Sequence, residues 1–243
     1  MAIARRKRSG MFGLVVTLVG VLLISGAPMV KAAEPSTGGV LPPNAQPLGY
    51  SLRDMARKIA GFTSSGNKPE YFPHSRLQIL YYDGSEGAPP PDVTFEGGGV
   101  TVSGANSFTV TQGTQFYVPV QSASDSSPVV GNWPDRNGAV PYFFGPSQLG
   151  ADNYRVIIDG VSTTLTPDYL VGPIPVTHLY DYDPTTGGTE GHEIITIAAF
   201  VDALPVGTHT VRIVGRLAGQ GIFATYGWTH YGLDFTYTVT VTP

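Results

Sequence analysis

The chain has 243 residues, a formal net charge of −4 and no cysteine. The absence of cysteine excludes disulfides and thiolate metal sites. Its 14 Lys and Arg residues are outnumbered by 18 Asp and Glu residues. The chain therefore lacks the basic surface that binding to phosphates requires, and we expect no nucleic-acid partner.

The first segment has the pattern of a secretory signal peptide. A basic cluster at residues 5–8 precedes an apolar run over residues 11–30, and Ala32 offers a small residue for cleavage. We expect residues 1–32 to be removed, leaving a secreted, periplasmic or cell-surface protein that meets the membrane only during export. Removal takes away five of the 14 basic residues and no acidic one, so the net charge falls from −4 to −9. An uncleaved membrane anchor is the alternative, because the apolar run nearly reaches the ~20 residues that a span needs.

The segment after the cleavage point predicts a linker followed by a helix. Residues 33–49 are rich in Pro, Gly and small polar residues, which is typical of a flexible linker. Ser51 can cap the helix, because Asp54 three residues later completes a capping box, and Gly61 predicts its end. One apolar face is formed by Leu52, Met55, Ala56, Ile59 and Ala60.

The rest of the chain predicts nine or ten short strands separated by turns. We expect them at residues 76–82, 100–102, 107–111, 115–121, 154–159, 161–165, 192–201, 208–217, 221–226 and 233–241. Pro119 predicts an edge strand or a bulge, and Asp159-Gly160 predicts a tight hairpin. Residues 50–243 are therefore expected to form one all-β domain, an antiparallel β-sandwich that is Ig-like or jelly-roll-like and begins with one short helix.

Three later motifs carry a family resemblance. They are the hairpin Tyr-Arg-Val-Ile-Ile-Asp-Gly at 154–160, the strand Leu-Pro-Val-Gly-Thr-His-Thr-Val at 204–211 and a closing strand of alternating aromatics and threonines. Together with the early helix, they make residues 49–243 similar to a loosely defined group of exported bacterial β-sandwich proteins of unknown function. The resemblance implies an exported sandwich, and it implies no catalytic residue.

An acidic loop is the best candidate for a metal site. Asp181, Asp183 and Glu190 supply the carboxylate oxygens that Ca²⁺ prefers, so Ca²⁺ is a possible cofactor. The EF-hand spacing fails, because Thr186 stands where the loop needs Gly and His192 where it needs Glu. A solvated acidic turn is the alternative.

Other catalytic patterns are weaker. His178, His192 and Glu193 lie near the acidic loop, but His192 and Glu193 are adjacent, so on a strand they face opposite sides, which is poor spacing for zinc. The chain contains no His-Glu-x-x-His or Gly-x-Ser-x-Gly sequence, and its triple glycine at 97–99 does not open a helix.

Aromatic residues form the candidate ligand site. Trp133 lies in a long loop, and Tyr226, Trp228, His230 and Tyr231 lie close together near the end of the chain. Exposed aromatic rings stack on sugar rings, whereas the alternative is that these side chains belong to the core.

Three functions remain open. The first is a non-catalytic binding or cell-envelope protein whose partner is an extracellular polysaccharide or an envelope component. The second is a glycan-active hydrolase or lyase in which His230, Tyr231 and Arg212 act as acid and base. The third is a structural protein of a surface assembly, which predicts concentration-dependent oligomers.

Overall fold

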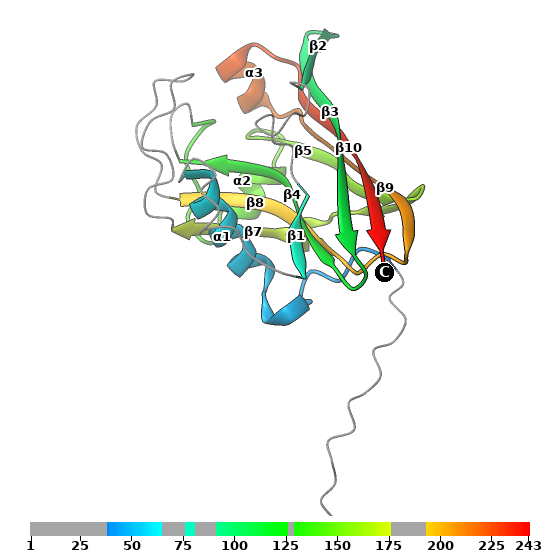
Figure 1. Cartoon of the computed structure of the whole chain (residues 1–243). Coiled ribbons are helices and arrows are strands. Elements are labelled where there is room, and N and C mark those ends of the chain that lie inside the picture. The colour runs from blue at the N-terminus through cyan, green and yellow to red at the C-terminus, as the bar shows by residue number, and fades with distance from the viewer. Residues whose placement is uncertain (1–37, 65–75, 81–90, 126–128, 176–192) are drawn as a thin grey trace, which may run out of the picture. The chain divides into compact units, whose positions relative to one another are not determined.

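The computed structural model describes residues 38–64, 76–80, 91–125, 129–175 and 193–243, and most of its elements are strands (Figure 1). In chain order the elements are η1 (Pro47–Gly49), α1 (Leu52–Ser64), β1 (Leu77–Ile79), β2 (Asp92–Glu96), β3 (Gly99–Thr111), β4 (Gln115–Ser124), α2 (Ala139–Phe144), β5 (Ala151–Ile158), β6 (Val161–Thr164), η3 (Pro167–Tyr169), β7 (Leu170–Pro175), β8 (Glu193–Val201), β9 (Gly207–Leu217), α3 (Gln220–Tyr226) and β10 (Tyr231–Thr242).

The strands form two sheets that share one core. One sheet has the order β1-β4-β8-β7 and the other the order β2-β3-β10-β9-β5-β6. Phe116 and Phe200 of the first sheet and Val211 and Tyr237 of the second belong to the same buried cluster. The domain is therefore mostly β, with two sheets packed against each other.

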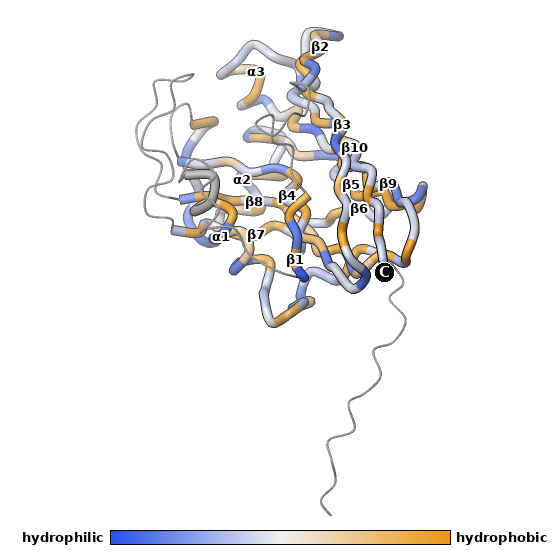
Figure 2. Tube along the Cα trace, in the orientation of Figure 1, coloured by the Kyte–Doolittle hydropathy of each residue, from blue (hydrophilic) through white to orange (hydrophobic). Residues whose placement is uncertain are grey.

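Strand β8 is buried on both faces, which explains its continuous apolar sequence. Ile195 belongs to the core between the sheets, whereas Ile194 packs with Ala56 and Ala60 of α1. A strand covered on both faces reads as an apolar run instead of an alternation, and Figure 2 shows hydrophobic residues along β8. Helix α1 thus covers the outer face of the four-stranded sheet.

The expected antiparallel architecture is wrong in two places. Of the eight strand pairings among the described residues, β1–β4 and β3–β10 are parallel, and the other six are antiparallel. The reason is the path of the chain after β3. A tight turn joins β3 to β4, yet these two strands lie in different sheets. The two parallel pairs therefore join strands that are distant in sequence, and both sheets are mixed.

The capping box of α1 is confirmed. The Asp54 backbone N–H donates to Ser51 Oγ at 3.2 Å, and the Ser51 N–H donates to Asp54 Oδ2 at 3.0 Å. The hydrogen bonds from Ser51 lower the pKa of Asp54, since they favour its charged form. The expected stop at Gly61 is wrong, because the helix continues to Ser64. An interior glycine costs a helix only about 1 kcal/mol.

Several strand predictions need correction. The segments at 100–102 and 107–111 are parts of one strand, β3, and residues 221–226 lie in helix α3. Strands β2 and β7 were not expected. Two turn predictions are confirmed: a bulge separates Pro119 from Gln121 in β4, and Asp159-Gly160, both with positive φ, joins β5 to β6.

Candidate functional site: an aromatic patch at the start of β10

Three of the expected site residues form a stack of aromatic rings. The Tyr226 and Trp228 ring centroids lie 5.0 Å apart with planes 16° apart, and those of Trp228 and Tyr231 lie 6.2 Å apart with planes 19° apart. Both tyrosine rings lie nearly parallel to the indole, so part of the flat surface of the indole is already covered. Trp228 is half-buried, whereas Tyr226 is 38% exposed and stands at the accessible end of the stack.

Local backbone geometry places this stack. Helix α3 ends at Gly227, which has a φ of 71° and whose N–H donates to the Phe223 carbonyl oxygen at 2.8 Å. Glycine adopts this left-handed conformation without strain, so the chain can leave the helix sharply. Strand β10 then begins at Tyr231. The sharp exit brings Tyr226 at the end of the helix back over Trp228.

Trp133 packs against Tyr142 of α2. Their rings meet edge to face with centroids 5.5 Å apart, and Trp133 Nε1 donates to Glu193 Oε2 at 3.2 Å. Burial raises the pKa of Tyr142 to about 12, against a backbone hydrogen bond with Val130, and the neighbouring Tyr226 adds to the rise. The half-buried Trp133 packs against the core and supports Tyr142.

Helix α3 is docked on the loop after α2 by glycines. The Gly219 N–H donates to the Leu149 carbonyl oxygen at 2.9 Å, and the Gly221 N–H donates to the Gln148 carbonyl oxygen at 3.1 Å. A Cβ atom on Gly219 would overlap the carbonyl oxygen of Gln148. Only glycine allows this close approach of two backbones, and it fixes the helix that carries Tyr226.

Two exposed phenylalanines were missed from the sequence. Phe223 of α3 is 61% exposed and lies one turn before Tyr226, and Phe95 of β2 is 74% exposed. Phe95 pairs with Val100 and Val100 pairs with Tyr231, so the three residues form one row on the same face of the sheet. The sequence signal that could have predicted the strand carrying Phe95 is the alternation of apolar and polar residues in Asp-Val-Thr-Phe-Glu. We define the aromatic patch as Phe223, Tyr226, Trp228 and Tyr231.

A buried tyrosine lies beneath the patch. Tyr154 packs against Gly215, its side chain is 2% exposed, and its hydroxyl has no hydrogen-bond partner in the part of the chain that the structure describes. Burial raises its pKa, and so does the neighbouring Tyr231. Burial also raises the pKa of Tyr231, with a contribution from Tyr226. Both hydroxyls therefore stay protonated and uncharged at neutral pH.

His230 faces a different neighbour. Its ring lies over Gly99, where a Cβ would overlap the imidazole, and its Nδ1 lies 3.2 Å from the hydroxyl of Thr229. That hydroxyl donates to the Gly97 carbonyl oxygen at 2.9 Å. The triple glycine is thus the β2–β3 turn and a platform for His230. His230 packs on this hairpin and is not part of the ring stack.

The structure does not assemble the acid–base group of His230, Tyr231 and Arg212. Tyr231 pairs with Leu217 of β9, and Arg212 stands five residues before Leu217, so alternation places them on opposite faces of the sheet. Arg212 is instead held by Asp234, with Nε donating to Oδ1 at 2.7 Å and Nη2 to Oδ2. The ion pair raises the pKa of Arg212, because it stabilises the cation.

The candidate metal residues are Asp181, Asp183 and Glu190, which lie outside the described residues together with His178 and His192. Within the described ranges, no group of three or more His, Asp or Glu side chains is arranged to hold a metal ion. Glu193 is described, and its carboxylate accepts the Trp133 hydrogen bond. No helix in the described ranges has the length and apolar character to span a membrane.

The chain matches no family model, no curated protein and no solved structure in comparisons with each. Its function therefore has to be inferred from the geometry of the aromatic patch.

Proposed function

We propose that this is an exported, non-catalytic binding protein that recognises an extracellular polysaccharide through the aromatic patch. The observation that carries the proposal is the exposed end of the ring stack, where Tyr226 rests on Trp228 and Phe223 stands exposed one turn away. Aromatic side chains exposed together are costly in water and mark interaction surfaces. An Ig-like or jelly-roll-like sandwich is part of the proposal, supported by two sheets packed over one core.

The chemistry of the patch favours a ligand with both apolar and hydroxyl-bearing faces. The rings of Phe223 and Tyr226 offer flat apolar surface, and the Tyr226 hydroxyl offers a donor and an acceptor. A sugar ring has the same combination, with C–H groups on its faces and hydroxyls at its edge. The rings are preorganised, since Trp228 and Tyr231 support Tyr226 from below, which lowers the entropy cost of binding.

A binding role is favoured over catalysis by the placement of charge. Two arginine ion pairs beside β10, Arg212–Asp234 and Arg216–Asp152, are bidentate pairs on the exposed face of the sheet. Arginines held in this way have raised pKa values and remain charged, so they do not exchange protons near neutral pH. The patch itself contributes neutral side chains.

The test is a binding assay on the exported protein against a panel of soluble and insoluble polysaccharides, with and without Ca²⁺. Bound protein and newly released sugar ends are measured in the same samples. Tyr226→Ala is expected to weaken binding at least about tenfold, the loss typical of an aromatic anchor. Val161→Ala is the control, because Val161 is also an exposed apolar residue, at 71%, but lies on β6.

Each outcome has a defined meaning. Equal loss in both variants, or no loss in Tyr226→Ala, would remove the patch from the proposal. New sugar ends would support the glycan-active enzyme instead. Loss of binding in chelator would assign a Ca²⁺ role to the loop that holds Asp181, Asp183 and Glu190.

A further inference from the structure

Strand β3 has a free hydrogen-bonding edge over its second half. On one side it pairs with β10 along its whole length, but on the other side β2 pairs only with Gly99–Ser103. No strand in the described part of the chain pairs with residues 104–111 on that side. Among the described residues, this side of an eight-residue stretch of β3 therefore has no strand partner.

The register with β10 determines which backbone N–H and C=O groups of β3 point to this edge. The N–H of Val100 donates to His230 and that of Gln112 to Thr242, so even-numbered residues of β3 are bonded to β10. Alternation then directs the N–H and C=O groups of the odd-numbered residues to the open edge. Those residues are Ala105, Ser107, Thr109 and Thr111.

Two of these groups have local partners. The Ser107 N–H donates to Asn106 Oδ1 at 2.7 Å, and the Thr111 carbonyl accepts from the Thr114 N–H at 3.2 Å. The side chain of Asn106 can release Ser107 by rotation when a strand arrives. The remaining groups of Ala105 and Thr109 face outward without a protein partner in the described ranges.

The sequence leaves this edge unprotected. Residues 104–111 read Gly-Ala-Asn-Ser-Phe-Thr-Val-Thr, with no charge and no proline. Natural edge strands usually carry a charged residue or a proline, which prevents pairing with other chains. Two other edges carry such residues, since β7 contains Pro173 and Pro175 and β2 begins with Asp92 and ends with Glu96, whereas the short edge strands β1 and β6 carry neither.

Strand β2 cannot extend to cover the edge. It runs antiparallel to β3 and begins at Asp92, opposite Ser103, so an extension toward the N-terminus would lie opposite residues 104 onward. The three residues before Asp92 in the sequence are prolines, 89–91. Proline has no N–H to donate to a ladder. The three prolines therefore disfavour an extension of β2 along the second half of β3.

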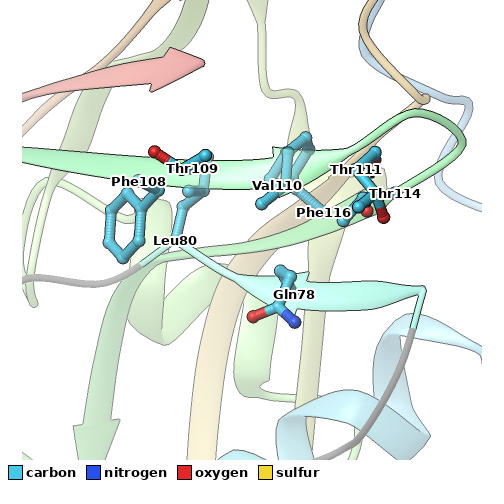
Figure 3. Close-up of a pocket in the computed structure, with 8 residues that line it drawn as sticks. All are labelled: Gln78, Leu80, Phe108, Thr109, Val110, Thr111, Thr114 and Phe116. Carbon is cyan, nitrogen blue, oxygen red and sulfur yellow. Dashed lines mark hydrogen bonds between the residues drawn. The ribbon is translucent and has the colours of Figure 1, made fainter. Parts of the chain in front are cut away.

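A groove lies beside the free edge. It has a volume of about 260 Å³ and is lined by residues of β1, β3 and β4, together with Leu80 and Thr114. Phe108 and Val110 lie on the side of β3 that faces this groove (Figure 3). Both are only half-buried. A strand added to β3 can therefore place an apolar side chain in the groove.

We propose that the occupant of this edge is the same edge of a second copy of the chain, paired antiparallel about a twofold axis at Phe108. The free residues are symmetric about this position: Ala105 would lie opposite Thr111 of the partner subunit, and Ser107 opposite Thr109 of the partner subunit. The two Phe108 rings meet at the groove. Because the paired segment is uncharged, the acidic chain joins here without like-charge contact. A twofold interface needs only one self-complementary surface.

The first test is sedimentation of the exported protein over a wide concentration range, compared with Thr109→Pro and Thr109→Val. The Thr109 N–H points to the open edge, so proline removes a donor there without breaking the ladder to β10. We expect a concentration-dependent dimer whose dissociation constant rises at least about tenfold in Thr109→Pro and stays unchanged in Thr109→Val. Circular dichroism of both variants checks that the fold is retained.

The second test uses the absence of cysteine. Phe108→Cys introduces a single thiol, and in the proposed dimer the two copies form a close, non-hydrogen-bonded pair whose Cα atoms lie about 4.5 Å apart, within disulfide range. Mild oxidation is expected to give a covalent dimer, whereas Thr238→Cys, on the exposed face of β10, gives none. A monomer at all concentrations, or equal crosslinking of both variants, would overturn the proposal.

Discussion

The imidazole of His209 lies between two acceptors: its Nδ1 is 2.7 Å from Asp159 Oδ2, and its Nε2 is 2.9 Å from the Pro205 carbonyl oxygen. Only the doubly protonated ring can donate to both. The hydrogen bond to Asp159 raises the pKa of His209 above its ordinary value, and this effect outweighs burial. The His209 imidazole thus connects the β5–β6 turn to the loop before β9.

This contact predicts a pH-dependent stability. Because the folded pKa of His209 is raised, its contribution is complete below the unfolded pKa of about 6.5 and is lost as the pH rises through the folded value. His209→Asn should remove the difference between low and high pH. We expect an effect of less than about 1 kcal/mol, since Asp159 is half-exposed. The measurement is thermal unfolding of both proteins across this range, and parallel pH profiles would contradict the prediction.

We also expect this contact to lose its stabilising effect at low pH, when the Asp159 carboxylate becomes protonated. Burial alone would raise its pKa, but the hydrogen bonds from His209 and from the Thr210 N–H, together with the charge of His209, outweigh burial and lower the pKa. Its contribution is therefore present above its unfolded pKa and is lost as the pH falls through the lower folded value. Asp159→Asn should be least stable relative to the wild type between the two transitions, near pH 5–6 by order of magnitude. Chemical denaturation at several pH values measures this difference.

The capping box predicts the effect of a change at Ser51. Ser51→Ala removes the acceptor for the Asp54 N–H, so the helix loses about 1 kcal/mol of stability. Helix α1 covers the outer face of the four-stranded sheet, so the loss should appear in the unfolding of the whole domain. Ser162→Ala, on the exposed strand β6, is the control and should change little. Urea unfolding monitored by tryptophan fluorescence gives both values.

We expect the loss of the hydroxyl to change the stability of the domain in opposite directions at two buried tyrosines. Tyr117 is fully buried and its hydroxyl has no hydrogen-bond partner in the described ranges, so Tyr117→Phe should be neutral or stabilise the domain by about 1 kcal/mol. Tyr142 has a backbone hydrogen bond with Val130, so Tyr142→Phe should destabilise it by a similar amount. Denaturant midpoints for the two variants provide the comparison, and a shift in the same direction for both would refute it.

Local signals predicted much of the fold. The capping box at Ser51 and the hairpin at Asp159 depend on neighbours within a few residues, and both are confirmed. The parallel pairing of β3 with β10 depends on where the chain goes after the turn at Gln112, which no local pattern records. Residues 221–226 have the apolar and aromatic composition of a strand, but Gly219 and Gly227 begin and end a helix there.

The site was only partly visible in the sequence. Tyr226, Trp228 and Tyr231 are close along the chain, so their proximity could be predicted, although their stacking could not. Trp133 contacts Tyr142 and not the ring stack in the described ranges, and the position of Tyr142 depends on the packing of α2. Arg212 was grouped with Tyr231 by residue type alone, and the pleat of the sheet separates them.

Gly219 provides the last prediction, because it docks the helix that carries the patch. Its φ of −75° and ψ of 161° are open to any residue, so the cost of Gly219→Ala comes from contact and not from backbone strain. The added Cβ would overlap the Gln148 carbonyl oxygen, so α3 has to shift, at a cost of about 1–3 kcal/mol. The shift should also change the fluorescence of Trp228, whereas Ala218→Ser at the exposed neighbour should change neither property. Unchanged stability and fluorescence in Gly219→Ala would show that this glycine contact does not hold the patch in place.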